Sequence, residues 1–383
     1  MARAKAEGPS PAGTRDRLQA MQAVSSRFGV WRPAPEVLTE VRAVRTCFPQ
    51  VDRATRVGGW PIQRICTVHG PSNHGKTAFC HGLGYSFLEG GHFYGFVDAE
   101  RTTPERWLRS LGEKYLKHPG FVAMRPTSFE ETVDAVRNFC LTIGEAKDKG
   151  ELEADTSGLI VVDSIRKLIP ERLLERILKD GAEGDKGSVD GMSGRGAQYK
   201  AALQSQWMDE LVPMLDECGI GMVIITREAD DPNASAQDLL YGKGWKVQGS
   251  KSLIYDASLV ARITRAEWTN AGPKGDPLIV GERHQVRIWK TKVGGKEDKH
   301  VDAFFHTSNG VEAPEGFDRP RDVFEMALEH GLIEQAGSWY TMGKDKLGQG
   351  EQKAMARFRE GLWKDAEEIL RLAIDKAQTG GEP

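Results

Sequence analysis

Residues 70–77 read Gly-Pro-Ser-Asn-His-Gly-Lys-Thr, and they constrain the fold more than any other stretch of the chain. The spacing G-x-x-x-x-G-K-[ST] is typical of a loop that cradles phosphates. Its glycines let successive backbone N–H groups turn toward a polyphosphate, its lysine reaches the β- and γ-phosphates, and its threonine hydroxyl can ligate Mg²⁺. Residues 64–68 predict a buried strand entering the loop, and residues 78–88 predict a helix leaving it, whose N-terminus favours anions. A chance match in a glycine-rich loop is the alternative, and this flanking pattern argues against it.

Composition narrows the class of protein further. The 383 residues carry a net charge of −3, so no global field attracts nucleic acid, and any such binding must come from local basic loops or from assembly. The five cysteines form no C-x-x-C pair, which indicates buried thiols and no zinc site or disulfide framework. We see neither an apolar signal segment at the start nor a stretch long enough to span a membrane, and we therefore expect a cytoplasmic protein with no membrane partner.

Strand and helix patterns alternate from residue 57 onward, which predicts an α/β fold with a mainly parallel, twisted sheet flanked by helices. We expect the whole chain to consist of four segments: a disordered tail at 1–13, an N-terminal helix and connection at 14–56, an ATPase-like core at 57–313 and a small α+β domain at 314–383. The N-terminal helix could dock on a neighbouring protomer or pack on its own domain. Expected strands lie at 64–69, 93–98, 158–163, 219–226, 258–264, 285–291 and 302–306. Expected helices lie at 77–89, 104–116, 129–147, 197–216, 320–330, 351–360 and 362–377, with a hairpin at 338–346.

Polar residues follow three of the predicted strands, and parallel sheets bind ligands beyond these strand ends. Four apolar residues precede Asp163, as expected for a carboxylate that holds the water shell of Mg²⁺; a helix N-cap is the alternative. Glu100, two residues past its strand, is the candidate general base, with an exposed surface glutamate as the alternative. Arg227 lies at the third strand end, on the same edge.

Four further features bear on function. Trp107 can stack on an adenine or simply pack in the core. Two long loops, at about 180–196 and 228–251, follow nucleotide-bearing strands, and the second interleaves lysines with aromatic residues and glycines, as single-strand binders do. Lys290 and Lys292 face the same side of a strand. They either lie on a solvated sheet edge or form a pair of cations directed at phosphate.

These residues together resemble the RecA recombinase family over most of the chain. The matching stretches occur in the same order as in that family: residues 57–61, the phosphate loop, 96–100, 160–164 and 290–292. Residues 332–340 and 346–350 look like the small C-terminal domain of RecA. The resemblance implies an ATP-dependent, Mg²⁺-requiring recombinase that forms helical filaments of itself on single-stranded DNA and exchanges strands with double-stranded DNA.

The resemblance also implies roles for particular residues. Glu100 would activate water, Lys290 and Lys292 would reach the ATP of a neighbouring protomer, and Thr77 and Asp163 would serve Mg²⁺. The expected catalytic set is Glu100, Lys76, Lys290, Lys292 and Arg227. The expected nucleotide-binding set is Gly70, Pro71, Ser72, Asn73, His74, Gly75, Lys76, Thr77, Ala78 and Trp107. The expected DNA-binding set is Arg195, Lys243, Trp245, Lys246 and Lys251.

The chain departs from the family pattern in ways that indicate a divergent member, such as a virus-encoded one. Arg227 stands where the family usually carries a glutamine that senses the γ-phosphate, and a permanent cation could sense it as well or break the coupling to DNA. Both loops are enlarged, and the second carries the pair Asp230-Asp231. Two other readings stay open: a helicase or regulatory ATPase that never exchanges strands, and an ATP-binding nucleoprotein scaffold with weak hydrolysis.

Overall fold

The computed structural model describes residues 40–175, 195–235, 244–271, 278–293 and 301–378, with the isolated positions 19, 21 and 237. The chain divides into two compact units, Met1–Val41 and Arg42–Pro383, and the second holds both the expected core and the expected C-terminal domain. The expected tail at 1–13 and most of the first loop lie outside the described residues. So does the expected N-terminal helix, except at positions 19 and 21, which are helical.

A nine-stranded mixed sheet forms the centre of the second unit, in the order β13-β12-β11-β10-β3-β7-β6-β4-β5. The six strands from β10 to β5 are parallel, whereas β11, β12 and β13 continue the sheet antiparallel. Their bounds are β3 Ile65–His69, β4 Phe93–Asp98, β5 Phe121–Met124, β6 Gly158–Asp163, β7 Ile220–Ile225, β10 Leu259–Ala271, β11 Leu278–Thr291, β12 Val301–Ser308 and β13 Gly316–Phe317. This arrangement confirms the expected fold class.

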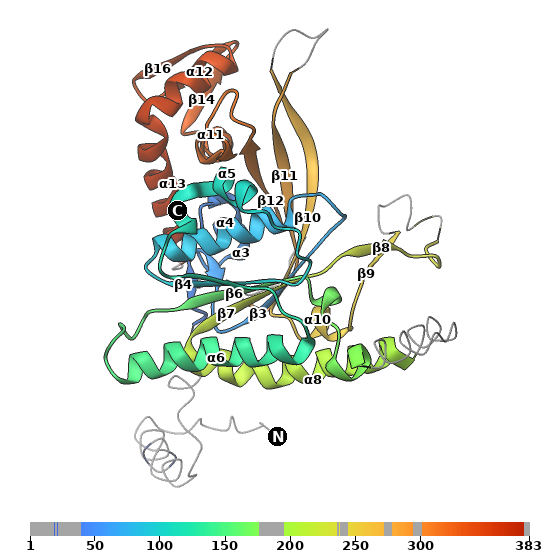
Figure 1. Cartoon of the computed structure of the whole chain (residues 1–383). Coiled ribbons are helices and arrows are strands. Elements are labelled where there is room, and N and C mark those ends of the chain that lie inside the picture. The colour runs from blue at the N-terminus through green and yellow to red at the C-terminus, as the bar shows by residue number, and fades with distance from the viewer. Residues whose placement is uncertain are drawn as a thin grey trace, which may run out of the picture. The chain divides into compact units, whose positions relative to one another are not determined.

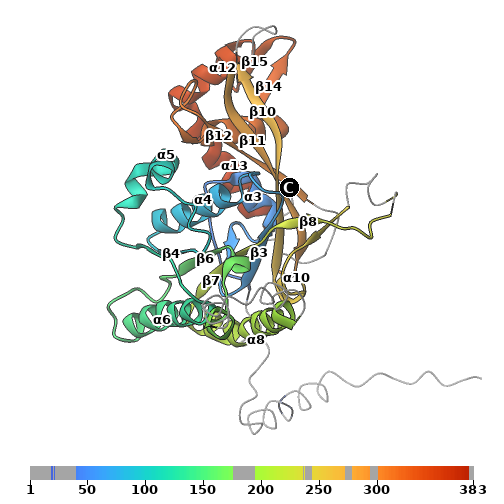
Figure 2. The same cartoon turned by 45° about the vertical axis from the view of Figure 1, so that its right-hand side comes forward.

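Helices cover both faces of this sheet because its parallel strands alternate apolar side chains between two cores. In β6, Leu159 and Val161 face one core, while Ile160 and Val162 face the other. Figures 1 and 2 show α6 and α8 along one face, with α3 and α4 on the opposite side. The helices of the core are α3 Pro49–Thr55, α4 Lys76–Glu89, α5 Glu105–Leu116, α6 Phe129–Asp148, α8 Arg195–Cys218 and α10 Ser252–Tyr255, with a short 3₁₀ turn at Ile165–Lys167. No described helix has the length and apolarity that crossing a bilayer requires.

The expected elements of the core are present, and the structure adds others. Two two-stranded sheets, β1 Ala43–Val44 with β2 Trp60–Pro61 and β8 Glu228–Asp230 with β9 Trp245–Val247, were not foreseen, nor were α3, α10 and the edge strand β5. The main difference is in β10 and β11, which extend well beyond the expected 258–264 and 285–291. They form a long hairpin whose outer part projects past the sheet (Figure 1).

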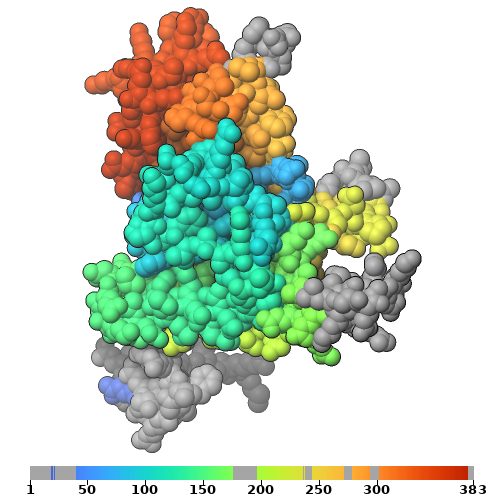
Figure 3. Space-filling view, viewed as in Figure 1, coloured from blue at the N-terminus to red at the C-terminus, as the bar shows by residue number. Residues whose placement is uncertain are grey.

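The C-terminal segment builds a third hydrophobic core of its own, around Phe324, Tyr340 and Phe358. It consists of α11 Arg319–Glu329, the antiparallel sheet β14 Ile333–Ala336, β15 Trp339–Met342 and β16 Asp345–Gln349, α12 Glu351–Arg357, a π-helical turn at Phe358–Leu362 and α13 Trp363–Gln378. In the space-filling view this segment, in red, continues directly into the orange surface of the hairpin region (Figure 3).

A buried histidine joins the sheet to the C-terminal segment. His306 of β12 contacts Asp322 Oδ1 through Nδ1 at 2.8 Å and Glu325 Oε1 through Nε2 at 3.1 Å, and both acids belong to α11. Burial alone would lower the pKa of His306, but the two carboxylates outweigh it and raise this pKa to about 9. The buried imidazolium therefore stabilises the fold while it keeps its proton.

We expect this contact to weaken as the pH rises. In the unfolded chain His306 loses its proton near pH 6.5, whereas in the folded chain it keeps the proton up to about pH 9. Its contribution is therefore complete below pH 6.5 and is lost between pH 6.5 and 9, amounting to about 1–3 kcal/mol. Urea unfolding across this range should show a steeper loss of stability in the wild type than in His306→Asn. Parallel curves would contradict the assignment.

Candidate functional site

The phosphate loop joins the end of β3 to the start of α4, as its sequence predicts. Gly70 and Gly75 take positive φ angles of 151° and 87°, and a Cβ atom at Gly70 would lie 2.1 Å from the carbonyl oxygen of Ile263. Glycine is therefore required at this position by close backbone approach. Lys76 Nζ donates to the carbonyl of Pro71 at 2.5 Å, so the loop curls around the lysine ammonium.

Thr77 and Asp163 meet beside the loop. The Thr77 hydroxyl donates to Asp163 Oδ2 at 2.5 Å, although 86 residues separate the two positions. Burial raises the pKa of the Asp163 carboxyl to about 6. The hydrogen bond from Thr77 and the charge of Lys76 therefore do not fully offset the burial of this carboxylate. A hydroxyl and a carboxylate are hard oxygen donors, and Mg²⁺ is usually bound by one or two such groups together with phosphate oxygens. These two residues fit a Mg²⁺ ion.

Glu100 lies on the same sheet edge, and both of its carboxylate oxygens are engaged. Ser164 Oγ donates to Oε1 at 2.8 Å, and an Arg227 guanidinium nitrogen lies 2.6 Å from Oε2. Burial alone would raise the pKa of Glu100, but these two hydrogen bonds, together with the charge of Arg227, lower it. Glu100 is therefore ionised at neutral pH, as a general base must be, yet Arg227 holds it in an ion pair.

A cavity of about 630 Å³ opens between these groups. Its lining includes the phosphate loop, Glu100, Asp163, Arg227 and Trp107. Trp107 is half-buried and also packs edge-on against His81, with ring centroids 5.6 Å apart. It therefore takes part in the core and lines the cavity. In Figure 3, a blue patch of the early core lies between the teal surface of α5 and the orange hairpin region.

Part of the cavity lining, the hairpin wall, comes from residues that the sequence did not single out. They belong to β10, β11 and β12: Arg265, Trp268, Ile279, Gly281, Glu282, His284, Thr307 and Ser308. The expected strands covered 258–264, 285–291 and 302–306, so these residues lay just outside them. The apolar run Leu278-Ile279-Val280 was the sequence signal that could have extended the strand.

Lys290 and Lys292 share one partner, which agrees with their expected common face. Lys290 Nζ donates to the carbonyls of Ile254 and Tyr255 at 2.6 and 2.7 Å, and Lys292 Nζ donates to Tyr255 at 2.9 Å. Both ammonium groups therefore lie at the C-terminal end of α10 in this chain. They do not line the cavity of their own protomer.

The expected DNA-binding residues lie in several places. Trp245 packs on the guanidinium of Arg262, with 4.4 Å between the guanidinium carbon and the ring centroid, and near the ring of His69. Lys246 is exposed and lies 4.0 Å from Asp231, and Lys251 is exposed just before α10. Lys243 lies outside the described residues, and Arg195 begins α8 with a side chain that also lies outside them.

Comparison with known proteins gives a consistent result. A family model described as the RecA C-terminal domain matches residues 321–370. Protein RecA of Chlorobium limicola is 26% identical over 361 residues, covering 93% of this chain and 90% of that protein. Protein RecA of Streptomyces venezuelae is 26% identical over 380 residues, covering 97% and 88%. Protein RecA of Kineococcus radiotolerans is 24% identical over 356 residues, covering 92% and 89%.

The fold and the cavity define an α/β protein with the phosphate-loop core of the RecA-like ATPases. The matches along nearly the whole chain, and the match of its C-terminal segment, show that this chain is similar to the RecA family.

Proposed function

We propose that the protein is a DNA-dependent ATPase that forms helical filaments on single-stranded DNA and exchanges strands with homologous double-stranded DNA. The observation that carries this proposal is the convergence of Lys76, Thr77, Glu100 and Asp163 on one cavity. Similarity to proteins named RecA along about nine-tenths of the chain supports it. In keeping with this, we propose that the four segments expected from the sequence act as tail, protomer-docking helix, ATPase core and accessory domain.

Each residue has a distinct part in the proposed reaction. The backbone N–H groups of residues 72–78 and the Lys76 ammonium hold the phosphates of ATP, and Trp107 contacts the base. Thr77 and Asp163 would hold Mg²⁺, which neutralises charge on the phosphates when bound. Glu100 orients the attacking water and accepts its proton, once the carboxylate leaves Arg227. Lys290 and Lys292, which do not line the cavity of their own protomer, would contact the nucleotide of the next protomer.

Fluorescence anisotropy with a labelled single-stranded oligonucleotide tests the proposal at moderate salt. We expect binding with Mg²⁺ and an ATP analogue, little binding without nucleotide, and a steep loss of affinity as salt rises. Lys76→Ala should remove the nucleotide-dependent part. Nucleotide-independent binding, or none, would contradict the proposal.

Arg227 favours one alternative, a nucleoprotein scaffold with weak hydrolysis. Its ion pair with Glu100 occupies Oε2 while Ser164 occupies Oε1, and the Glu100 side chain is only 12% exposed. Under this alternative DNA and ATP still bind, but turnover is slow. A joint-molecule assay with homologous and heterologous duplexes separates strand exchange from both this alternative and a helicase.

Replacing Arg227 by Gln should accelerate hydrolysis. Freeing Glu100 from a part-exposed ion pair worth about 1 kcal/mol corresponds to a rise in kcat of about fivefold. Steady-state ATP hydrolysis with saturating single-stranded DNA measures it. Arg227→Lys keeps the charge and should stay close to the wild type. An unchanged rate in Arg227→Gln would mean that the ion pair does not restrain the base.

A further inference from the structure

The phosphate loop contacts the β10–β11 hairpin through the side chain of His74. The backbone N–H of Arg265 in β10 donates to His74 Nδ1 at 2.9 Å. His74 lies inside the loop, between the two glycines that shape it. It is half-buried and, like Arg265, it lines the nucleotide cavity.

The hairpin has a free backbone donor at this point for a topological reason. Strand β3 pairs with β10 only as far as Arg262, because β3 ends at His69 and the chain turns into the phosphate loop. Beyond Arg262, β10 loses its parallel neighbour. The pairing with β11 also shifts between Arg265 and Glu267. The imidazole of His74 takes the place of the missing strand at Arg265, where an unpaired N–H would otherwise cost free energy.

The Arg265 side chain adds to the attachment. Its guanidinium donates to the carbonyl of Asn73 at 2.7 Å and, through Nε, to Glu282 at 2.8 Å, and it stacks on Trp268 with 4.1 Å to the ring centroid. On the other strand, His284 Nδ1 lies 3.2 Å from the carbonyl oxygen of His74. The hairpin thus contacts residues 73 and 74 at three points.

The hydrogen bond requires a neutral His74 with its proton on Nε2, because a protonated Nδ1 cannot accept. The surroundings favour this form. Burial, followed by the charges of Arg265 and Lys76, lowers the pKa of His74. The acceptor is therefore available at neutral pH.

We propose that His74 is a positioning residue for the nucleotide: by accepting the Arg265 N–H, its Nδ1 holds the phosphate loop in the shape that binds a triphosphate. The inference rests on the proposed function, since it concerns the same site. Binding through backbone N–H groups needs those groups fixed in direction before the ligand arrives, and the ordering cost otherwise falls on the affinity. The attachment of residues 73 and 74 to the hairpin supplies this order before the nucleotide binds.

Three variants of His74 test the acceptor itself. Asn places Oδ1 on Cγ, where Nδ1 of His is attached, so His74→Asn keeps an acceptor in position. Gln carries the same amide one methylene further away, and Ala carries none. We expect a Kd for Mg²⁺–ATP within about twofold of the wild type in His74→Asn, and about tenfold weaker in both His74→Gln and His74→Ala. The full-length chain is titrated with a fluorescent ATP analogue, and melting without nucleotide checks folding.

The outcomes separate cleanly. Weak binding by the Gln and Ala variants, with recovery in Asn and similar melting temperatures throughout, is the expected result. Wild-type affinity in all three variants overturns the inference, and so does an Asn variant as weak as Ala, because the imidazole would then act other than as an acceptor. If the wild type itself does not bind ATP, the proposed function fails, which the same titration shows first.

Discussion

Replacement of Glu100 by Gln should reduce kcat for ATP hydrolysis by at least about a hundredfold, the usual contribution of a positioned general base. Gln has nearly the same shape and can still accept from Ser164, which now bonds Oε1 at 2.8 Å. Nucleotide binding should therefore be retained, and single-stranded DNA should stay bound because turnover no longer releases it. Steady-state hydrolysis tests the loss of kcat, and equilibrium ATP binding on the same preparation tests the retention of nucleotide.

Asp98 provides a matched control for Glu100. It ends the same strand but bonds Arg125 Nε at 3.0 Å and does not line the cavity, so Asp98→Asn should leave kcat within a fewfold of the wild type. A Glu100→Gln protein that hydrolyses ATP at the wild-type rate would show that another group activates the water.

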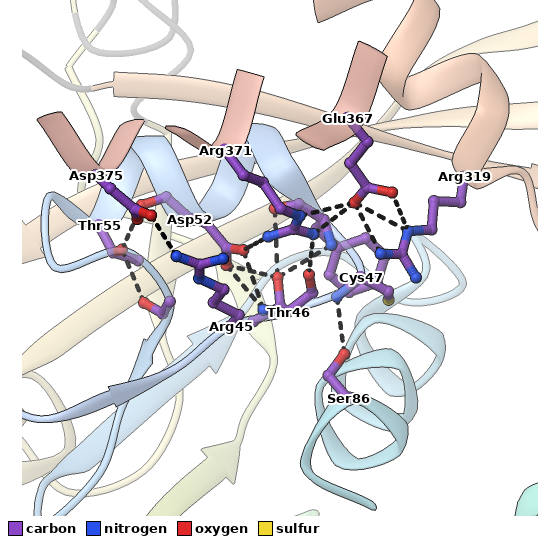
Figure 4. A network of polar contacts seen from close by, with 12 residues as sticks. Arg45, Thr46, Cys47, Asp52, Thr55, Ser86, Arg319, Glu367, Arg371 and Asp375 are labelled. Atoms are coloured by element: carbon purple, nitrogen blue, oxygen red, sulfur yellow. Dashed lines mark hydrogen bonds and ion pairs between the residues drawn. The ribbon is translucent and has the colours of Figure 1, made fainter. Parts of the chain in front are cut away.

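Removal of Arg371 should lower the free energy of unfolding by about 3–5 kcal/mol, the range for breaking a buried ion pair. Arg371 of α13 donates to Asp52 of α3 at 2.9 Å, to the carbonyl of Thr46 at 2.7 Å and to Glu367 (Figure 4). The Asp52 side chain is 1% exposed, and burial raises its pKa to about 7 although Arg371 opposes this. In Arg371→Ala, both acids would be left without this partner.

The matched control for Arg371 lies in α12 of the same C-terminal segment, where it is exposed to water. Arg357 pairs with Glu360, and both side chains are more than half exposed, so Arg357→Ala should change stability by less than about 1 kcal/mol. Urea unfolding at pH 7.5 measures both variants. Equal effects would mean that the network in Figure 4 does not anchor α13 to the core.

The candidate site was largely predictable because parallel strands align their carboxyl ends. The sequence placed Glu100, Asp163 and Arg227 at three such ends, and the structure brings all three to the cavity of the phosphate loop. Local pattern was sufficient here, since each residue lies within three positions of the end of an apolar run and the loop has its own spacing. The small C-terminal domain was equally predictable from residues 332–350.

The hairpin wall was not predictable in the same way. Trp268 and Ile279 are 45% and 44% exposed, so the strands around them lack the apolar alternation that marks a buried strand. The pairing of His74 with Arg265 joins positions 191 residues apart. The ion pair between Glu100 and Arg227 depends on strand order and side-chain direction, which a single sequence does not reveal.

Electron microscopy of the full-length chain with single-stranded DNA, Mg²⁺ and a slowly hydrolysed ATP analogue tests the central claim most directly. The proposed function predicts long, right-handed helical filaments that form with the nucleotide and disappear in Lys76→Ala. Closed hexameric rings under the same conditions would contradict it and point to a helicase.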